Sequence, residues 1–408
     1  MRRPQEWHPE TCPYDVHSRC SPADSASVRV AVQWAMPFCP RAPRRGRPLL
    51  AALLLLLALA TAAPPSFASA SSLPGTAALA TQAPEWVLLD SSEPAAQLFA
   101  PASGALFART ASGLKRSDDG GVSWRTVELP PRASFQRRIV VEIDPSDHTR
   151  LFANGEQGLY RSSDDAATWT LLPVPSGTGS SIRSIAVSPA DRSLIYANKV
   201  GDENLGTVLW TVRSADGGDT WELIKTDHSG PSCGYGVDLF APHPTDPTRV
   251  YRNVSCTRGG PGGGPLEHSA DRGVTWADLT PREAGGATRI VGSGRRAAEQ
   301  RFYLATRLVP KTASRVYESE DGLGDWRLIA EATVDTIDAL ADDPRNPDRV
   351  YVGTSAGNVH ALVGGDQQWA SLGQEPIGAI HDLVLGVDGA NLYAATEQGV
   401  WRYPLTPP

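Results

Sequence analysis

The sequence predicts an all-β fold, a seven-bladed β-propeller of four-stranded antiparallel blades. Three observations predict it. A Ser-x-Asp-x-Gly-x-Ser/Thr-Trp pattern recurs, a strand–turn–strand pattern precedes each copy, and seven such units fill residues 85–403. Each unit holds four short strands, which is the content of one propeller blade. The 38 glycines and 34 prolines supply the many tight turns that such a chain needs.

The eight-residue pattern is complete in three copies and altered in three others. The complete copies are SDDGGVSW (117–124), SADGGDTW (214–221) and SADRGVTW (269–276). SSDDAATW (162–169) has Ala166 at the glycine position, SEDGLGDW (319–326) keeps Ser, Asp and Trp, and LVGGDQQW (362–369) keeps only Trp. Asp can accept hydrogen bonds from amides of a tight turn, and Gly supplies its positive φ.

We interpret the recurring positions of this pattern as structural staples of hairpin turns. A carbohydrate-binding or catalytic motif is the alternative interpretation. The residues concerned are Asp119, Asp164, Asp216, Asp271, Asp321, Trp124, Trp169, Trp221, Trp276 and Trp326.

The strand pattern between these turns locates the blades. Each unit opens with an apolar strand, a Pro/Asp turn and an aromatic-bearing strand, as in IDALADDPRNPDRVYVG (337–353). First strands are expected to begin near Leu98, Ile139, Ile182, Val237, Arg289, Ile337 and His381. The last unit, residues 381–403, contains only three strands. We expect residues 85–89 to supply its fourth strand and close the ring, which leaves no unpaired inner edge.

A targeting segment is predicted before the propeller. Four arginines within residues 41–47 precede the apolar run 49–63, and Ala68-Ser69-Ala70 follows it. This order is typical of a secretory signal peptide, and the run is shorter than the roughly twenty residues of a membrane span. An N-terminal membrane anchor is the alternative. Met36 lies at a suitable distance before the run, so we expect translation to start there.

The chain is accordingly divided into five parts. Residues 1–35 are interpreted as an artefact of the gene model, 36–70 as the signal peptide, 71–84 as a disordered linker, 85–403 as the propeller and 404–408 as a tail. The mature protein is expected in a secreted or periplasmic compartment. Arg44-Arg45 leaves general secretion and twin-arginine export both open.

Two cysteines remain in the predicted mature chain, Cys233 and Cys256. They flank a turn centred near residue 245, and an antiparallel hairpin folded there brings them side by side. In an oxidising compartment we expect a disulfide between them, and two buried free thiols are the alternative. The formal net charge of −7 argues against a nucleic-acid partner.

The repeat resembles that of the BNR/Asp-box propellers, which include sialidases, xyloglucanase-like hydrolases, sortilin-type receptors and photosystem II assembly factors. The resemblance covers residues 85–403 and implies the fold rather than one activity. For a sialidase it implies an Arg-Ile-Pro segment, which the sequence lacks. One ring behind a signal peptide is similar in layout to the assembly factors, but the arginine-rich patch expected of them is not evident.

The resemblance also implies where a ligand binds, on the face opposite the Asp turns. Connections expected to be long on that face are 199–206, 226–236, 256–265 and 307–314. They are interpreted as a lobe over the mouth of the ring, or as unconstrained insertions. Polar residues that open first strands are expected to face the central channel: Arg183, Asp238, Arg289, Asp338 and Asp382.

These channel residues allow three interpretations. They can bind a sugar or peptide, supply paired carboxylates for glycoside hydrolysis, or line a water-filled channel whose charges cancel. We favour an exported, monomeric, non-catalytic propeller that binds a glycan or protein partner, without cofactor or metal and without a stable membrane span. The alternative is a sialidase-like or xyloglucanase-like glycoside hydrolase acting at the central funnel.

Overall fold

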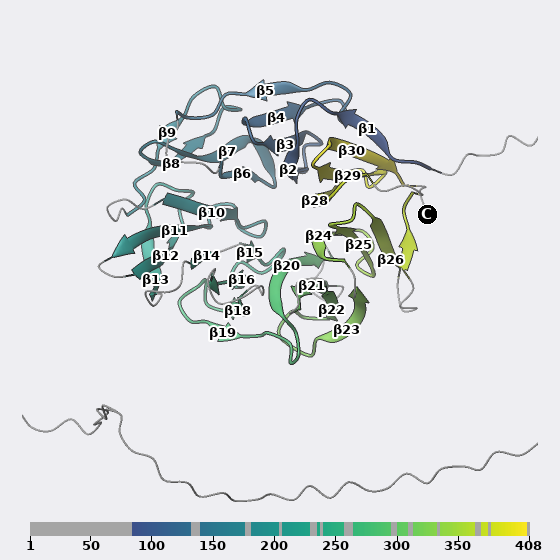
Figure 1. Cartoon of the computed structure of the whole chain (residues 1–408). Coiled ribbons are helices and arrows are strands. Elements are labelled where there is room, and N and C mark those ends of the chain that lie inside the picture. The colour runs from purple at the N-terminus through teal and green to yellow at the C-terminus, as the bar shows by residue number, and fades with distance from the viewer. Residues whose placement is uncertain are drawn as a thin grey trace, which may run out of the picture. The chain divides into compact units, whose positions relative to one another are not determined.

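Seven four-stranded antiparallel sheets form a ring, and no helix occurs among the described residues (Figure 1). The predicted seven-bladed β-propeller is thereby confirmed. The computed structural model describes residues 84–131, 139–175, 181–203, 206–228, 235–236, 240–256, 264–294, 300–308, 313–332, 335–363, 369–373 and 377–405. These residues belong to one unit of the chain, Ala78–Pro408. The predicted signal peptide and the segment before it lie outside the described residues.

The first four blades follow one another along the chain. Blade 1 contains β2 (Ala95–Phe99), β3 (Leu106–Thr110), β4 (Leu114–Ser117) and β5 (Arg125–Val127). Blade 2 contains β6 (Val141–Asp144), β7 (Asp147–Gly155), β8 (Gly158–Ser162) and β9 (Thr170–Leu171). Blade 3 contains β10 (Ser181–Val187), β11 (Ile195–Glu203), β12 (Gly206–Ser214) and β13 (Glu222–His228). Blade 4 contains β15 (Phe240–Pro242), β16 (Val250–Asn253), β18 (Leu266–Ser269) and β19 (Ala277–Asp278).

The remaining blades complete the ring. Blade 5 contains β20 (Gly286–Ser293), β21 (Arg301–Arg307), β22 (Ser314–Ser319) and β23 (Arg327–Ala332). Blade 6 contains β24 (Ile337–Asp342), β25 (Arg349–Thr354), β26 (Val359–Val363) and β27 (Trp369–Ser371). Blade 7 contains β28 (Ile380–Leu385), β29 (Asn391–Thr396), β30 (Gly399–Pro404) and β1 (Val87–Asp90). A separate two-stranded ladder joins β14 (Tyr235–Gly236) to β17 (Ser255–Cys256).

Blade 7 combines three strands from the C-terminal end of the chain with one from the described N-terminal end. β1 lies beside β30 in the ring (Figure 1). The two strands pair antiparallel, with Val87 opposite Arg402 and Leu88 opposite Trp401. The Trp86 indole Nε1 also donates to the backbone oxygen of Leu372 over 2.7 Å, which ties this segment to blade 6. The paired strand therefore begins and ends slightly later than the predicted residues 85–89.

The second strand of each blade is the most buried, because it lies inside its sheet and between two neighbouring blades. Each carries a large apolar residue that is followed by an aromatic residue. These buried pairs are Leu106-Phe107, Leu151-Phe152, Ile195-Tyr196, Val250-Tyr251, Phe302-Tyr303, Val350-Tyr351 and Leu392-Tyr393. The hydrophobic core is divided into clusters that each join adjacent blades, such as β3 to β5 with β6 and β7. Such clusters bury the apolar faces of strands that could not be stable alone.

Four turns between third and fourth strands share one hydrogen-bond pattern. In the turn 269–276, Ser269 Oγ donates to Asp271 Oδ1 and accepts from the Gly273 amide, both over 2.7 Å. Asp271 also accepts from the Thr275 amide over 2.8 Å and from its hydroxyl over 2.6 Å. Equivalent bonds to Ser and Asp occur in the turns 117–124, 162–169 and 214–221.

These bonds stabilise the ionised form of the turn aspartates. The hydroxyl four residues later is the largest cause, and together with the turn amides it lowers the pKa of Asp119, Asp216 and Asp271 to about 2. The turn 319–326 differs, because Asp321 accepts from the Leu323 amide over 2.8 Å. There the buried Trp326 Nε1 has no partner among the described residues.

Blade 3 extends further than the sequence predicts. Most of the predicted long connection 199–206 is strand, because β11 continues to Glu203 and β12 begins at Gly206, and the first three residues of the connection 226–236 belong to β13. Pairing of β11 with β12 as far as Glu203 and Gly206 replaces most of the first expected loop. Within the described ranges, no helix has the length and apolar character needed to cross a membrane.

Candidate functional site

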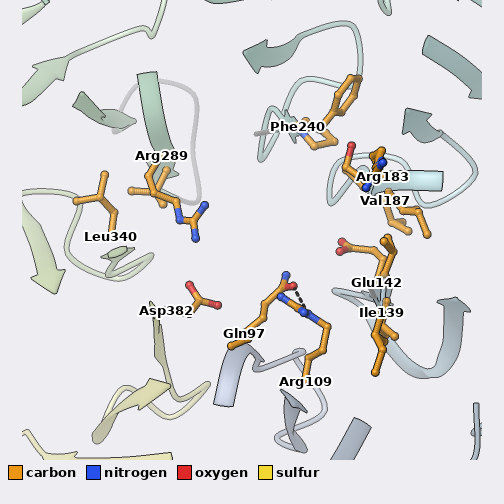
Figure 2. Close-up of a pocket in the computed structure, with 18 residues that line it drawn as sticks. Gln97, Arg109, Ile139, Glu142, Arg183, Val187, Phe240, Arg289, Leu340 and Asp382 are labelled. Atoms are coloured by element: carbon orange, nitrogen blue, oxygen red, sulfur yellow. Dashed lines mark hydrogen bonds between the residues drawn. The ribbon is translucent and has the colours of Figure 1, made fainter. Parts of the chain in front are cut away.

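A cavity of about 320 Å³ lies where the seven first strands face one another. Residues of β2, β6, β10, β15, β20, β24 and β28 all border it, and Figure 2 shows their side chains. Apolar side chains such as Phe240 and Leu340 form part of the wall, but polar groups make up most of its surface. Its longer polar and charged side chains are Gln97, Arg109, Glu142, Arg183, Arg289 and Asp382. Every blade thus contributes to one site, and most of its polar side chains carry an ionisable group.

A recurrent β-bulge brings polar residues of the first strands to this cavity. In blades 1, 3, 5, 6 and 7, the pairing of first with second strand shifts by one residue near the start of the first strand. Each shift leaves one extra, unpaired residue in the first strand. Gln97, Arg289 and Asp382 each come directly after that residue, whereas Arg183 is itself the extra residue in blade 3. A bulge redirects the side chains beside it, which lets a strand buried in the core carry a charged group into the channel.

Glu142 enters the cavity from the middle of β6 (Figure 2). Its carboxylate points towards the open centre and is surrounded by protein, so its partial exposure is to the cavity. Burial raises its pKa to about 8, and the nearby charge of Asp144 acts in the same direction. The Val187 backbone amide opposes this shift only in part. Near neutral pH, Glu142 is therefore mainly a protonated hydrogen-bond donor.

Asp382 enters from β28 and ties blade 7 to blade 1. Its Oδ2 accepts from the Leu98 backbone amide over 3.0 Å. Burial raises the pKa of this carboxyl, whereas the positive charges of Arg289 and Arg109 and two backbone amides oppose the shift. Asp382 thus has a structural contact as well as a place in the cavity.

Three arginines supply positive charge to the cavity. Arg109 Nε donates to Gln97 Oε1 over 3.1 Å, which Figure 2 shows as a dashed line. Arg289 Nη2 donates to the backbone oxygen of His381 over a long 3.4 Å, and its guanidinium points towards the cavity. Within the described part of the chain, Arg183 is exposed and its guanidinium has no hydrogen-bond or ion-pair partner. Guanidinium groups remain charged at all physiological pH values, so three permanently charged side chains and two carboxyls line the described part of the cavity.

The structure brings three of the five predicted channel residues together. Arg183, Arg289 and Asp382 line the cavity. Asp338 does not: its carboxylate binds the guanidinium of Arg307 and accepts from Thr336 Oγ1 over 3.1 Å. The reason is its short side chain on the extra residue of the blade 6 bulge. Asp238 lies outside the described residues.

Sequence reasoning missed Gln97, Arg109 and Glu142. Glu142 lies opposite Phe152, the aromatic residue of the second strand, and a comparison of this position between blades could have revealed it. The equivalent residues in the other blades are Phe99, Ala186, Ala241, Val291, Ala341 and Val384. One acid among six apolar residues at matching positions is a detectable signal, but it needs the units to be aligned through their second strands.

The other predicted sites can be placed only in part. Among the described residues, no group of three or more His, Cys, Asp and Glu side chains is positioned to hold a metal ion. Cys233 lies outside the described residues. Cys256 is in β17, where its backbone lies opposite Tyr235 of β14. The disulfide therefore stays a prediction.

Solved structures resemble this fold at low sequence identity. A GH74 xyloglucanase from Xanthomonas campestris is 19% identical with a TM-score of 0.54, over 78% of this chain and 53% of the enzyme. This chain thus spans about half the length of that xyloglucanase. YCF48 bound to D1 peptide is 13% identical with a TM-score of 0.52, over 79% of this chain and 97% of YCF48. The RRP9 WD40 repeats are 12% identical with a TM-score of 0.54, over 80% and 99%.

These likenesses establish the propeller fold alone. No protein-family model matches the sequence, and no curated protein matches it. The neighbours include both an enzyme and proteins with other named roles. Function must therefore be argued from the site.

Proposed function

We propose that this protein is an exported, non-catalytic BNR/Asp-box propeller that binds a glycan or protein partner at its central cavity. The observation that carries the proposal is the cavity itself, to which all seven first strands contribute and in which charged side chains of different blades meet. Ligand sites are typically hollows in which a few polar groups converge, and this cavity has such groups on a surface that is more polar than that of most small-molecule sites. First strands begin on the face that carries the second-to-third-strand connections, so a partner would enter from that face.

Two features favour binding over catalysis. The aspartates predicted to face the channel are not gathered as a catalytic group among the described residues, because Asp338 is paired with Arg307 outside the cavity. Asp382 is already engaged by the Leu98 amide. The permanently charged arginines, by contrast, are suited to holding a ligand without reacting with it.

The remaining parts of the proposal rest on sequence and local geometry. The ordered arginines, apolar run and Ala-x-Ala site before residue 71 support export. Four turns with the same Ser and Asp hydrogen bonds support assignment to the BNR/Asp-box group. The similar YCF48 structure holds a peptide, which makes a protein partner as reasonable as a glycan.

A glycoside hydrolase is a second candidate, and the Glu142–Asp382 arrangement favours it. Both carboxyls face the cavity, and burial raises the pKa of each. A protonated carboxyl and an ionised one on opposite sides of a sugar are the elements of acid–base glycoside cleavage. This candidate predicts turnover that both Glu142→Gln and Asp382→Asn abolish.

One screen separates the two candidates. The exported mature protein is applied to glycan and peptide arrays, and each bound ligand is then incubated with the protein and analysed by mass spectrometry. Binding of an intact ligand supports the proposal. Cleavage that disappears in Glu142→Gln establishes the hydrolase instead. Absence of both binding and cleavage would contradict both candidates.

A further inference from the structure

We infer that the central cavity binds a carboxylate group of a small organic acid through Arg289, while Arg183 adds positive charge from the opposite side of the cavity (Figure 2). This inference rests on the proposed binding function and specifies its ligand chemistry. The ligand can be a free acid or a uronic acid unit of a glycan, since both present the same group.

The balance of charges is the first argument. Among the described residues that line the cavity, Arg183 and Arg289 carry two permanent positive charges, and Arg109 is bonded to Gln97. Near neutral pH the Glu142 carboxyl is mainly protonated, so Asp382 alone faces these two charges and an excess of positive charge remains. A low-dielectric wall strengthens the attraction of that charge for an anion.

Unused donors are the second argument. Arg289 makes one long hydrogen bond, of 3.4 Å to the His381 backbone oxygen, and Arg183 makes none within the described residues. Each guanidinium carries five N–H donors in a planar fork, which matches the two oxygens of a carboxylate. Most of these donors are thus available to a ligand.

The size of the site is the third argument. About 320 Å³ is near the lower end of the range for small-molecule sites, so it suits a single sugar or small acid. The apolar walls around Phe240 and Leu340 can cover the carbon skeleton while the charged groups hold the acid.

Glu142 makes the binding depend on pH. When protonated it donates a hydrogen bond to the ligand, and when ionised it repels the ligand. The charged groups around it are Arg109 on β3, Arg183 on β10, Arg289 on β20, Asp382 on β28 and Asp144 on its own strand. Because burial raises the Glu142 pKa to about 8, affinity should fall as pH rises through this value.

Isothermal titration of the mature protein with glucuronate, acetate and glucose at pH 6.5 and pH 9 tests the inference. We expect both acids to bind and glucose not to bind. Acetate alone would identify a free acid site, whereas much tighter binding of glucuronate would identify a sugar acid. From pH 6.5 to pH 9, affinity should fall about tenfold, since about a tenth of Glu142 is then protonated.

Three variants sharpen the result. Arg289→Gln should weaken binding about 10- to 100-fold, which is the contribution of a charge-assisted hydrogen bond. Arg282→Gln is the matched control, because Arg282 is exposed and does not line the cavity, and it should bind as the wild type does. Glu142→Gln keeps a neutral donor and should bind equally at both pH values. Circular dichroism checks that each variant is folded, and Arg183→Gln replaces Arg289→Gln if the latter is not.

Several outcomes overturn the inference. Neither acid binding, or unchanged affinity in both arginine variants, would contradict a carboxylate site. Binding of an uncharged glycan or peptide found on the arrays, without any response to either acid, would leave the proposed binding function standing. The two failures are therefore distinguishable.

Discussion

Replacement of Gly273 by alanine tests how the repeated turns hold neighbouring blades together. Gly273 has φ +88°, a conformation that L side chains rarely adopt. A Cβ atom at this position would lie 2.6 Å from Ile224 Cδ1 of blade 3 and 3.3 Å from Trp276 Cζ2. The substitution therefore combines a backbone penalty with a clash between blades.

The expected loss follows from these two causes. Left-handed backbone costs about 1–2 kcal/mol for a residue with a Cβ, and overpacking a core costs about 1–3 kcal/mol. We expect Gly273→Ala to lower the free energy of unfolding by about 2–5 kcal/mol. Urea unfolding measures this loss as a lower midpoint at an unchanged slope.

Controls separate the two causes. Gly113→Ala is the matched control, because a Cβ atom added at Gly113 would have no other atom within 4 Å and the φ of Gly113 is not positive. This substitution should change the free energy of unfolding by no more than about 0.5 kcal/mol. Ile224→Ala removes the side chain that clashes with the added Cβ atom. Gly273→Ala should therefore lower the free energy of unfolding less in the Ile224→Ala protein than in the wild type. A Gly273→Ala protein as stable as the wild type would refute this description of the turn.

Three further predictions concern packing and charge. Val127 and Ala166 belong to one core cluster, and they occupy the positions at which other blades place Leu89 beside Gly121 and Ile224 beside Gly273. The larger side chain of Val127→Leu should therefore crowd Ala166 and lower the stability of the protein by about 1–3 kcal/mol. Adding Ala166→Gly should restore that stability, which thermal unfolding of the double variant measures. Asp271→Asn should cost about 1 kcal/mol without changing ligand affinity. Because folding lowers the Asp271 pKa to about 2, this difference should be complete above about pH 4 and lost as pH falls towards 2; a difference independent of pH would contradict the staple interpretation. Arg252 is fully buried and donates to Glu267 over 2.7 Å and to Asp227 over 2.9 Å. Arg252→Ala should therefore lower the free energy of unfolding in urea by about 3–5 kcal/mol. An unchanged free energy of unfolding would show that the two acids find other partners.

The blade count and the turns could be predicted from the sequence because both depend on local chemistry. The Ser and Asp of each turn bind amides within the same eight residues, so the pattern carries its own structural explanation. The first strands could be placed within a few residues for the same reason. An apolar strand followed by a Pro/Asp turn specifies a hairpin without reference to the rest of the chain.

The cavity could be predicted only in part, because it depends on register between strands. Asp338 and Asp382 both open a first strand, yet Asp338 is the extra residue of its bulge and Asp382 follows the extra residue. At the position of the extra residue, the long side chain of Arg183 reaches the cavity, whereas the shorter Asp338 binds Arg307; Asp382, one position later, enters the cavity. Glu142 escapes prediction because it lies inside a strand that otherwise reads as core.

The most direct test of the central cavity as the binding site compares the affinity of the tightest array ligand for three proteins. Isothermal titration is carried out with wild type, Arg289→Gln and the exposed control Arg282→Gln, and the recovered ligand is weighed by mass spectrometry. We predict at least about a tenfold loss of affinity in Arg289→Gln alone and an intact ligand in every sample. Equal affinity in all three proteins, or a cleaved ligand, would contradict a non-catalytic binding site at the centre of the ring.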